Sequence, residues 1–175
     1  VRALCIAQFD AADNMTDSMA ALSALANAEG GERDGALQKF YDRWKDEPLV
    51  LDKWFAVQAS SRLPDTLAAV KRLMRHPAFT LKNPNRVRSV VSSFCHGNQV
   101  RFHAADGSGY AFAADQIIAI DPLNPQVAAR LARSFDRWRK FDAARRAHSQ
   151  AALERIRDTA GLSKDTFEVV TRALA

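Results

Sequence analysis

Residues 83–110 read NPNRVRSVVSSFCHGNQVRFHAADGSGY, and this stretch decides how the rest of the chain is interpreted. Asn83 suits a helix start because its side chain accepts hydrogen bonds from free amide groups, and Pro84 suits the first helical position because its missing N–H costs nothing there. The apolar residues that follow recur at helical spacing: Val87, Val90, Val91 and Phe94. We therefore expect a helix from Pro84, with Arg86 and Arg88 projecting from it, and then a polar loop over 97–109 that lies on the surface or lines a cavity.

The segments on either side carry the same helical pattern. Asn124 and Pro125 repeat the cap-and-proline opening of the central stretch, and Gly161 followed by Ser163 marks the end of one helix and the start of the last. Between 32 and 45 the apolar residues fall at i, i+3, i+4 and i+7: Leu37, Phe40, Tyr41 and Trp44. We expect this helix to pack antiparallel to the one after Pro48.

Several helix boundaries are also expected from local signals. Thr16 is expected to cap the second helix, and Gly30 with Gly31 to stop it. The isoleucine-rich run 110–120 is expected to be a buried helix, and 141–160 a long charged one.

No segment alternates between apolar and polar residues with period two over a useful length, so we expect no sheet. Successive helices of about 10–20 residues joined by short turns favour an all-α fold, with paired antiparallel helices stacked as an α-solenoid or superhelix. The sequence lacks a strict repeat, which leaves a globular helical bundle open. A solenoid, unlike a bundle, predicts a concave face on which polar residues from successive helices line up.

Composition indicates a globular protein. The chain has 175 residues, of which 47% are hydrophobic and 26% charged, and a net charge of +5 permits an acidic partner without requiring one. Cys5 and Cys95 match no metal or redox spacing, so reduced thiols in a cytoplasmic protein are expected. No apolar run is long enough to cross a membrane, and the start at Val1 is typical of a piece of a longer chain.

The search for chemistry finds one cluster of potential metal ligands: Cys95, His96, His103 and Asp106. Their spacing presents no two of them to one ion, so imidazoles bonded to backbone carbonyls are the favoured interpretation. His76 and His148 are expected to be solvated or capping residues. Gly107 to Gly109 fits a turn that needs positive φ better than a phosphate cradle, because no strand precedes it and no lysine follows.

The run from Arg130 to Arg146 is the most basic part of the chain. Phosphate groups would bind such a patch, with an affinity that falls steeply with salt. Aromatic residues for base stacking are not interleaved with it, because Phe135 and Trp138 belong to the inward stripe. A solvated helix face with acids contributed by neighbours is therefore favoured, and no nucleic-acid partner is expected.

Four motifs occur in a fixed order: NPNRVRS at 83–89, FHA and DGSGY within 102–110, NPQVA with Arg130 in 124–130, and RALA at 172–175. Through these motifs and their order, the sequence resembles the C-terminal domain of bacterial aminopeptidase N, a zinc metallopeptidase of the gluzincin group. The first half, around 32–63, is consistent with that family but less motif-like. Residues 95–101 depart most from the family pattern.

The resemblance implies that residues 1–175 form one helical C-terminal domain of an enzyme that removes N-terminal residues from peptides. It places the zinc ion, the H-E-x-x-H helix and the G-x-M-E-N segment in a preceding catalytic domain, and none of those motifs occurs here. We therefore expect no catalytic residue, no metal and no activity in this domain alone. Its expected partners are that catalytic domain and the peptides that pass through the enclosed chamber.

By matching positions, the resemblance makes Arg88 and Arg130 the residues expected to face the chamber or its entrance. Both follow an Asn-Pro helix start, so both are expected near positive helix ends, where they would attract peptide carboxylates. The alternative is a free-standing basic helical-repeat module that binds protein or nucleic acid through its concave face.

Overall fold

The computed structural model describes residues 2–175, and this part of the chain holds helices and turns but no strand. The α-helices are α1 (Arg2–Ala11), α2 (Met15–Leu25), α3 (Gly31–Trp44), α4 (Pro48–Ala59), α5 (Thr66–Leu73), α6 (Pro84–Val87), α7 (Gln99–Phe102), α8 (Ser108–Ile120), α9 (Pro125–Ala132), α10 (Ala143–Arg157) and α11 (Lys164–Leu174). A π-helix, η1 (Arg88–Gly97), and two 3-10 turns, η2 (Arg133–Phe135) and η3 (Trp138–Lys140), lie between them. The all-α prediction is confirmed.

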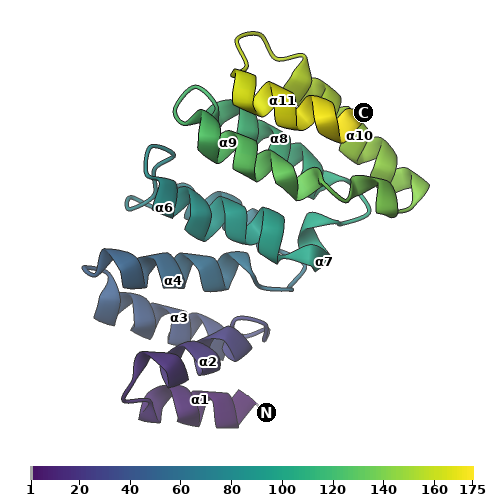
Figure 1. Ribbon diagram of the computed structural model, residues 1–175. Helices are drawn as coiled ribbons and strands as arrows, with labels where there is room; N and C mark the ends of the chain where they lie inside the picture. The colour runs from purple at the N-terminus through teal and green to yellow at the C-terminus, as the bar shows by residue number, and fades with distance from the viewer. Residues whose placement is uncertain (1) are drawn as a thin grey trace.

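The helices form a stack that runs from the N-terminal to the C-terminal end (Figure 1). Along it α1 contacts α2, α3 contacts α4, α4 contacts η1, α8 contacts α9 and α10, and α9 contacts α11. The two termini lie at opposite ends, as they must where each layer packs mainly on its neighbours. The predicted solenoid is therefore confirmed, including the packing of α3 on α4, where Trp54 Nε1 donates to the Leu37 carbonyl at 2.9 Å.

The apolar core is divided into two clusters that meet at α4. Leu51, Phe55 and Ala59 belong to the larger cluster, which continues to the C-terminal end, whereas Val57 belongs to a smaller one with α2 and α3. A helix with apolar residues on two sides packs against a layer on each of them. Helix α4 therefore joins the N-terminal helices to the rest of the stack.

Two of the expected boundaries near the N-terminus are wrong. Asn14, not Thr16, caps α2, because its side chain accepts from the Asp17 N–H at 2.9 Å. Helix α2 already ends at Leu25, and Gly30, with a φ of 118°, precedes the first residue of α3 instead of stopping α2. Glycine tolerates this positive φ, and a glycine with a positive φ can precede a helix as well as end one.

Other boundaries are close to those expected. Asn83, Asn124 and Ser163 each accept a backbone N–H at the start of α6, α9 and α11. The charged helix is shorter than 141–160, because Asp142 caps α10 and the helix ends at Arg157. The apolar stripe after Pro125 is buried as expected, but it passes from α9 into the turns η2 and η3.

The central stretch is the part that differs most from the sequence prediction. After Val87 the helix widens into the π-helix η1, a rare form in which each backbone hydrogen bond spans five residues. The expected loop over 97–109 contains α7 and the first residues of α8, and Asn98 and Phe102 within it are buried. Gln99, Val100 and Asp106 stay exposed, so the connection is partly packed and partly on the surface, as expected of a segment that lines a hollow.

None of the helices within residues 2–175 is both long enough and apolar enough to span a lipid bilayer.

Candidate functional site

Arg86 and Arg88 lie two residues apart but in opposite environments. Arg86 is only 7% exposed, and its guanidinium donates to the carbonyls of Ala78 at 3.0 Å and Pro48 at 2.9 Å. It also forms an ion pair with Asp52 of α4. The expectation that Arg86 projects from the helix is wrong, because this side chain ties the start of α6 to α4.

Arg88 is exposed at the first turn of η1, where Nη1 donates to the Asn85 side chain at 3.1 Å. It lines a hollow of about 380 Å³ between α4 and η1, together with Lys53 and Ser89. Within residues 2–175 no carboxylate is paired with Arg88. Its charge is therefore available to a ligand.

Arg130 is exposed on α9 and lines a groove of about 670 Å³ between α9 and α11. It lies in the last turn of this short helix, at the negative end of the helix dipole, so the expected position near a positive helix end is wrong. A cation there is stabilised by the carbonyls of the last turn. No ion pair involves Arg130 in the described chain.

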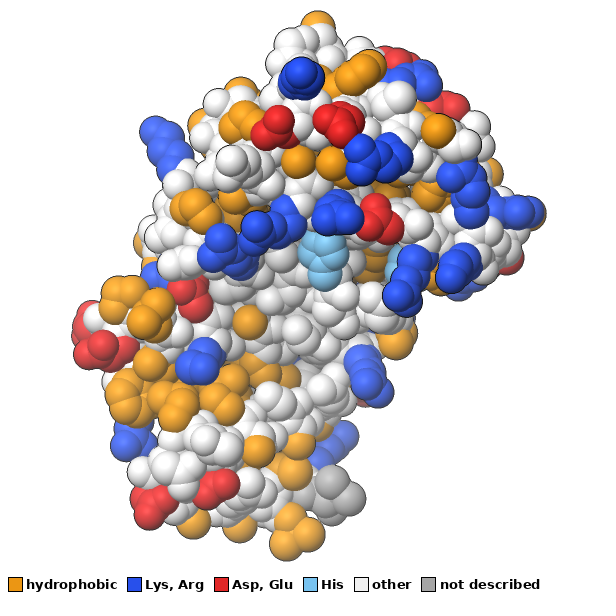
Figure 2. All heavy atoms as spheres, in the orientation of Figure 1, with side chains coloured by type: hydrophobic (Ala, Val, Ile, Leu, Met, Phe, Trp, Pro, Cys, Tyr) orange, Lys and Arg blue, Asp and Glu red, His pale blue; other side chains and the backbone are white. Residues whose placement is uncertain are grey.

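The neighbouring helices bring basic residues onto one face of the stack. Figure 2 shows Lys and Arg side chains in a band across the middle of this face, with an apolar area towards the N-terminal helices. Helix α9 contacts η1 within the stack. Burial lowers the pKa of His96, while the Arg130 carbonyl and the Asp136 charge oppose that change. The C-terminal end of η1 therefore lies beside Arg130.

The α9–α11 groove carries charges of both signs. Three of its arginines have partners: Arg133 pairs with Asp136 at 3.5 Å, Arg172 pairs with Glu168, and Arg139 donates to the carbonyls of Ala173 and Leu174. Arg130 differs from these three because neither a carboxylate nor a carbonyl of the described residues is bonded to its guanidinium. Within the run Arg130 to Arg146, the ion pairs use acids of the run itself, Asp136 with Arg133 and Asp142 with Arg145, rather than the acids expected from neighbouring helices.

The four candidate ligands of the central stretch do not form one site. Cys95 is fully buried, and burial raises the pKa of its thiol. His103 Nδ1 lies 2.8 Å from the Tyr110 hydroxyl, and desolvation, followed by the Arg145 charge, lowers the pKa of this imidazole. Asp106 instead accepts the Ser108 N–H at 3.0 Å at the start of α8. Within residues 2–175 no group of three such side chains lies close enough together to hold a metal ion, so these residues do not fit a zinc site.

The Gly107 to Gly109 segment is a turn, as expected, with a φ of 72° at Gly107. The His148 ring covers this glycine, and a Cβ built on Gly107 would lie 2.5 Å from His148 Cγ. His148 is therefore a packing residue here, rather than only a solvated one.

Two buried polar groups were missed in the sequence, Asn98 and Asp121. Asn98 donates to the carbonyls of Ala59 at 3.1 Å and Ser61 at 2.6 Å. Asp121 accepts the Ser163 N–H at 2.7 Å and so joins the end of α8 to the start of α11. His76, expected to be solvated or capping, is half-buried. Its ring packs among Tyr41, Trp54 and Phe55, and Nδ1 accepts the Ala78 N–H at 3.1 Å, so it bonds the backbone as a capping residue does.

Comparison with known families matches residues 1–175 to a model described as a domain of unknown function, DUF3458_C, with ARM repeats. The chain belongs to the DUF3458_C family. The ARM-repeat description agrees with the stack of helices in Figure 1, since ARM repeats are helical units that pack on their neighbours.

Known relatives of this DUF3458_C chain are much longer proteins. Aminopeptidase N of Escherichia coli K12 is 44% identical over 168 residues, which is 96% of this chain and 19% of the relative. Aminopeptidase N of Caulobacter vibrioides is 44% identical over 169 residues, or 97% of this chain and 20% of the relative. A crystal structure of Legionella pneumophila aminopeptidase A in complex with aspartic acid superposes with a TM-score of 0.93 at 38% identity, over 99% of this chain and 20% of that one.

The DUF3458_C chain thus spans about a fifth of the length of these aminopeptidases. It is homologous to their C-terminal domain, and the resemblance to aminopeptidase N is confirmed.

Proposed function

We propose that this domain is the helical lid of a zinc-dependent aminopeptidase N, which encloses the active-site chamber and restricts entry to short, unfolded peptides. The observation that carries the proposal is the 44% identity to aminopeptidase N, which extends over 96% of the chain. An exposed basic face supports it, because peptide substrates carry a carboxylate that positive charge attracts. The domain works with a catalytic domain of the same polypeptide.

Zinc belongs to that catalytic domain in this proposal, where it would activate the water that hydrolyses the first peptide bond. The donor residues of the present chain do not fit a zinc site, as the burial of Cys95 and the engagement of His103 with Tyr110 indicate. The lid alone is therefore proposed to be inactive. Its two free thiols, Cys5 and Cys95, favour a reducing compartment, and we place the enzyme in the cytoplasm.

Arg88 and Arg130 are proposed to face the chamber or its entrance. Both are exposed, both line hollows, and both lack an acidic partner among the described residues. Their role is to attract and orient the carboxylate end of a peptide.

The test uses the whole peptidase with Arg88→Gln and Arg130→Gln, and compares kcat/KM for tri- and tetrapeptides with that for an alanyl anilide. We expect each variant to lower kcat/KM for peptides by roughly threefold to tenfold and to change the anilide by less than about twofold, since the anilide has no carboxylate. Arg146→Gln, an exposed charge on α10, is the matched control. Equal losses on both substrates would count against a chamber role.

The inactivity of the lid has its own test. The isolated chain is assayed with zinc on the anilide, and turnover that co-purifies with the chain would contradict the proposal. Titration with nucleic acid at two salt concentrations covers the alternative, because a phosphate-binding module must show affinity that falls as salt rises.

A further inference from the structure

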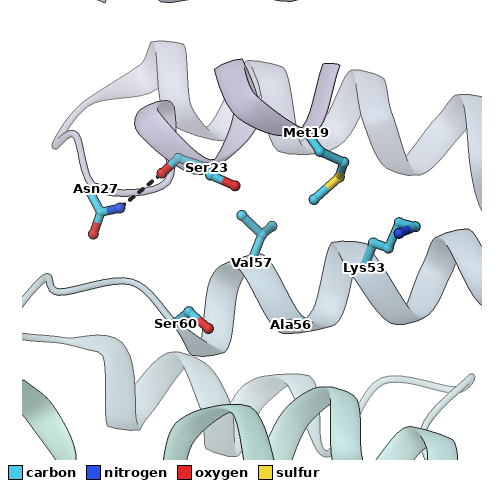
Figure 3. A pocket seen from close by; sticks show the side chains of 7 residues that line it. All are labelled: Met19, Ser23, Asn27, Lys53, Ala56, Val57 and Ser60. Carbon is cyan, nitrogen blue, oxygen red and sulfur yellow. Dashed lines mark hydrogen bonds between the residues drawn. The ribbon is translucent and has the colours of Figure 1, made fainter. Parts of the chain in front are cut away.

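The exposed side of α4 is hollowed on both of its edges. Between α2 and α4 lies a hollow of about 280 Å³, lined by Met19, Ser23, Lys53, Ala56 and Val57 among others (Figure 3). The hollow that contains Arg88 lies on the other edge, between α4 and η1. Lys53 and Ala56 line both. The two hollows therefore adjoin along α4, and together we call them the α4 groove.

The α4 groove is shallow and apolar at one end. In Figure 3 the side chains of Met19 on α2 and Val57 on α4 point into the space between the two helices. Ala56, in the middle, has a small side chain that leaves room for a ligand. Ser89 and Ser93 continue the small-residue floor to the η1 side. An extended chain with modest side chains fits such a surface better than a bulky or globular partner.

The positive charge of the α4 groove is not neutralised by the chain itself. Lys53 is exposed and forms no ion pair with any acid of residues 2–175, and the same is true of Arg88. Asp52 lines the same hollow as Lys53 and Arg88, but its carboxylate is paired with the buried Arg86. Two cations thus line the same hollow with no described acid paired to either.

We propose that the α4 groove binds the C-terminal end of a short peptide, with the free carboxylate held by Lys53 and Arg88 and an apolar side chain against Met19 and Val57. Charge complementarity selects this occupant, since two cations match one carboxylate and the adjoining surface is apolar. A nucleic acid would leave that apolar end unused. The inference rests on the proposed function, and it adds Lys53 and the α2–α4 hollow as the elements that recognise the far end of the substrate.

The test measures binding to the 175-residue chain itself, without any peptidase activity. The ¹⁵N-labelled chain is titrated with the peptide Ala-Ala-Leu and, separately, with its C-terminal amide, and amide shifts are followed by NMR. We expect saturable shifts confined to α2, α4 and the start of η1 for the acid, and at least threefold weaker binding of the amide. Lys53→Gln should weaken binding of the acid by roughly threefold to tenfold, whereas Lys53→Arg should retain it within about twofold.

Matched controls remove the same charge elsewhere. Lys71→Gln on α5 is exposed and does not line the groove, so it should leave the affinity unchanged. Equal binding of acid and amide, shifts outside the groove, or an unchanged affinity in Lys53→Gln would overturn the inference. So would shifts that depend on protein concentration alone, because a second copy of the chain would then occupy the groove. These results leave the enclosure role intact, since that role is tested by peptide and anilide kinetics in the whole peptidase.

Discussion

Replacing Gly109 by alanine tests the packing of the central stretch. A Cβ built at Gly109 would lie 2.2 Å from the Phe102 carbonyl oxygen, 2.8 Å from its carbonyl carbon and 2.9 Å from its Cα. These are backbone atoms, which cannot rotate away as a side-chain tip does. Either α7 or the start of α8 must therefore move.

The movement is expensive because Phe102 is fully buried. Its ring packs edge-on against Phe94 at 6.3 Å and Tyr110 at 5.3 Å between centroids. Overpacking in a core costs about 1–3 kcal/mol, and a backbone clash of this depth belongs at the upper end, so we expect Gly109→Ala to lower the free energy of unfolding by about 3 kcal/mol. For a chain of this size that corresponds to a fall in Tm of roughly 6–12 °C.

The measurement is urea denaturation followed by circular dichroism at 222 nm. Gly35→Ala is the matched control, because Gly35 lies inside α3 with no atom within 4 Å of a built Cβ. Alanine should raise stability there by about 1 kcal/mol. If Gly109→Ala unfolds within about 0.5 kcal/mol of the parent, the close approach of α7 to α8 is not a constraint on the fold and the reasoning fails.

Three further predictions follow from buried polar groups. Arg86→Met should destabilise the chain by about 3 kcal/mol, because it leaves Asp52 and two carbonyls without their donor. Arg88→Met is the control and should change stability by less than about 0.5 kcal/mol. Equal effects in urea titrations would contradict the assignment of Arg86 as the structural arginine and Arg88 as the exposed one. Asp121→Ala should cost about 1–3 kcal/mol in the same assay because it leaves the Ser163 N–H unpaired, and a neutral result would show that water replaces the carboxylate. The third concerns the imidazoles whose pKa values are lowered mainly by desolvation: His76, His96 and His103. The unfolded chain then binds more protons than the folded chain just below pH 6.5. The urea concentration at the unfolding midpoint should therefore decrease when the pH is lowered from 7.5 to 5.5, and an increase would refute the burial argument.

Local signals predict helix starts well in this chain. Asn83, Asn124 and Ser163 were found because a capping side chain and the amide it accepts lie within three residues of each other. Periodicity also predicted the all-α stack, since each helix buries an apolar stripe against its neighbour. The error at α2 has a local cause too: Asn14 and Thr16 are both plausible caps, and only the backbone shows which one is used.

The missed features depend on partners far along the chain. Asn98 bonds to carbonyls 37 and 39 residues away, and Asp121 bonds to Ser163, 42 residues away. No spacing rule connects such pairs, so Asn98 was interpreted as a loop residue. The π-helix η1 is a further case, because the choice of a five-residue hydrogen bond depends on how the helix packs rather than on its residues.

Arg86 and Arg88 show how the fold separates a structural charge from an available one. Successive residues of a helix are rotated by about 100°, so two residues apart they point about 200° away from each other. Arg86 is therefore buried against Pro48 and Asp52 of α4, whereas Arg88 stays exposed at the edge of the hollow between α4 and η1, where no described acid pairs with it. A substitution that freed Arg86 would also change the direction of Arg88, so under the proposed function Asp52→Asn in the full-length protein should affect peptide turnover as well as stability. If Asp52→Asn lowers stability but leaves peptide turnover unchanged, the two charges act independently.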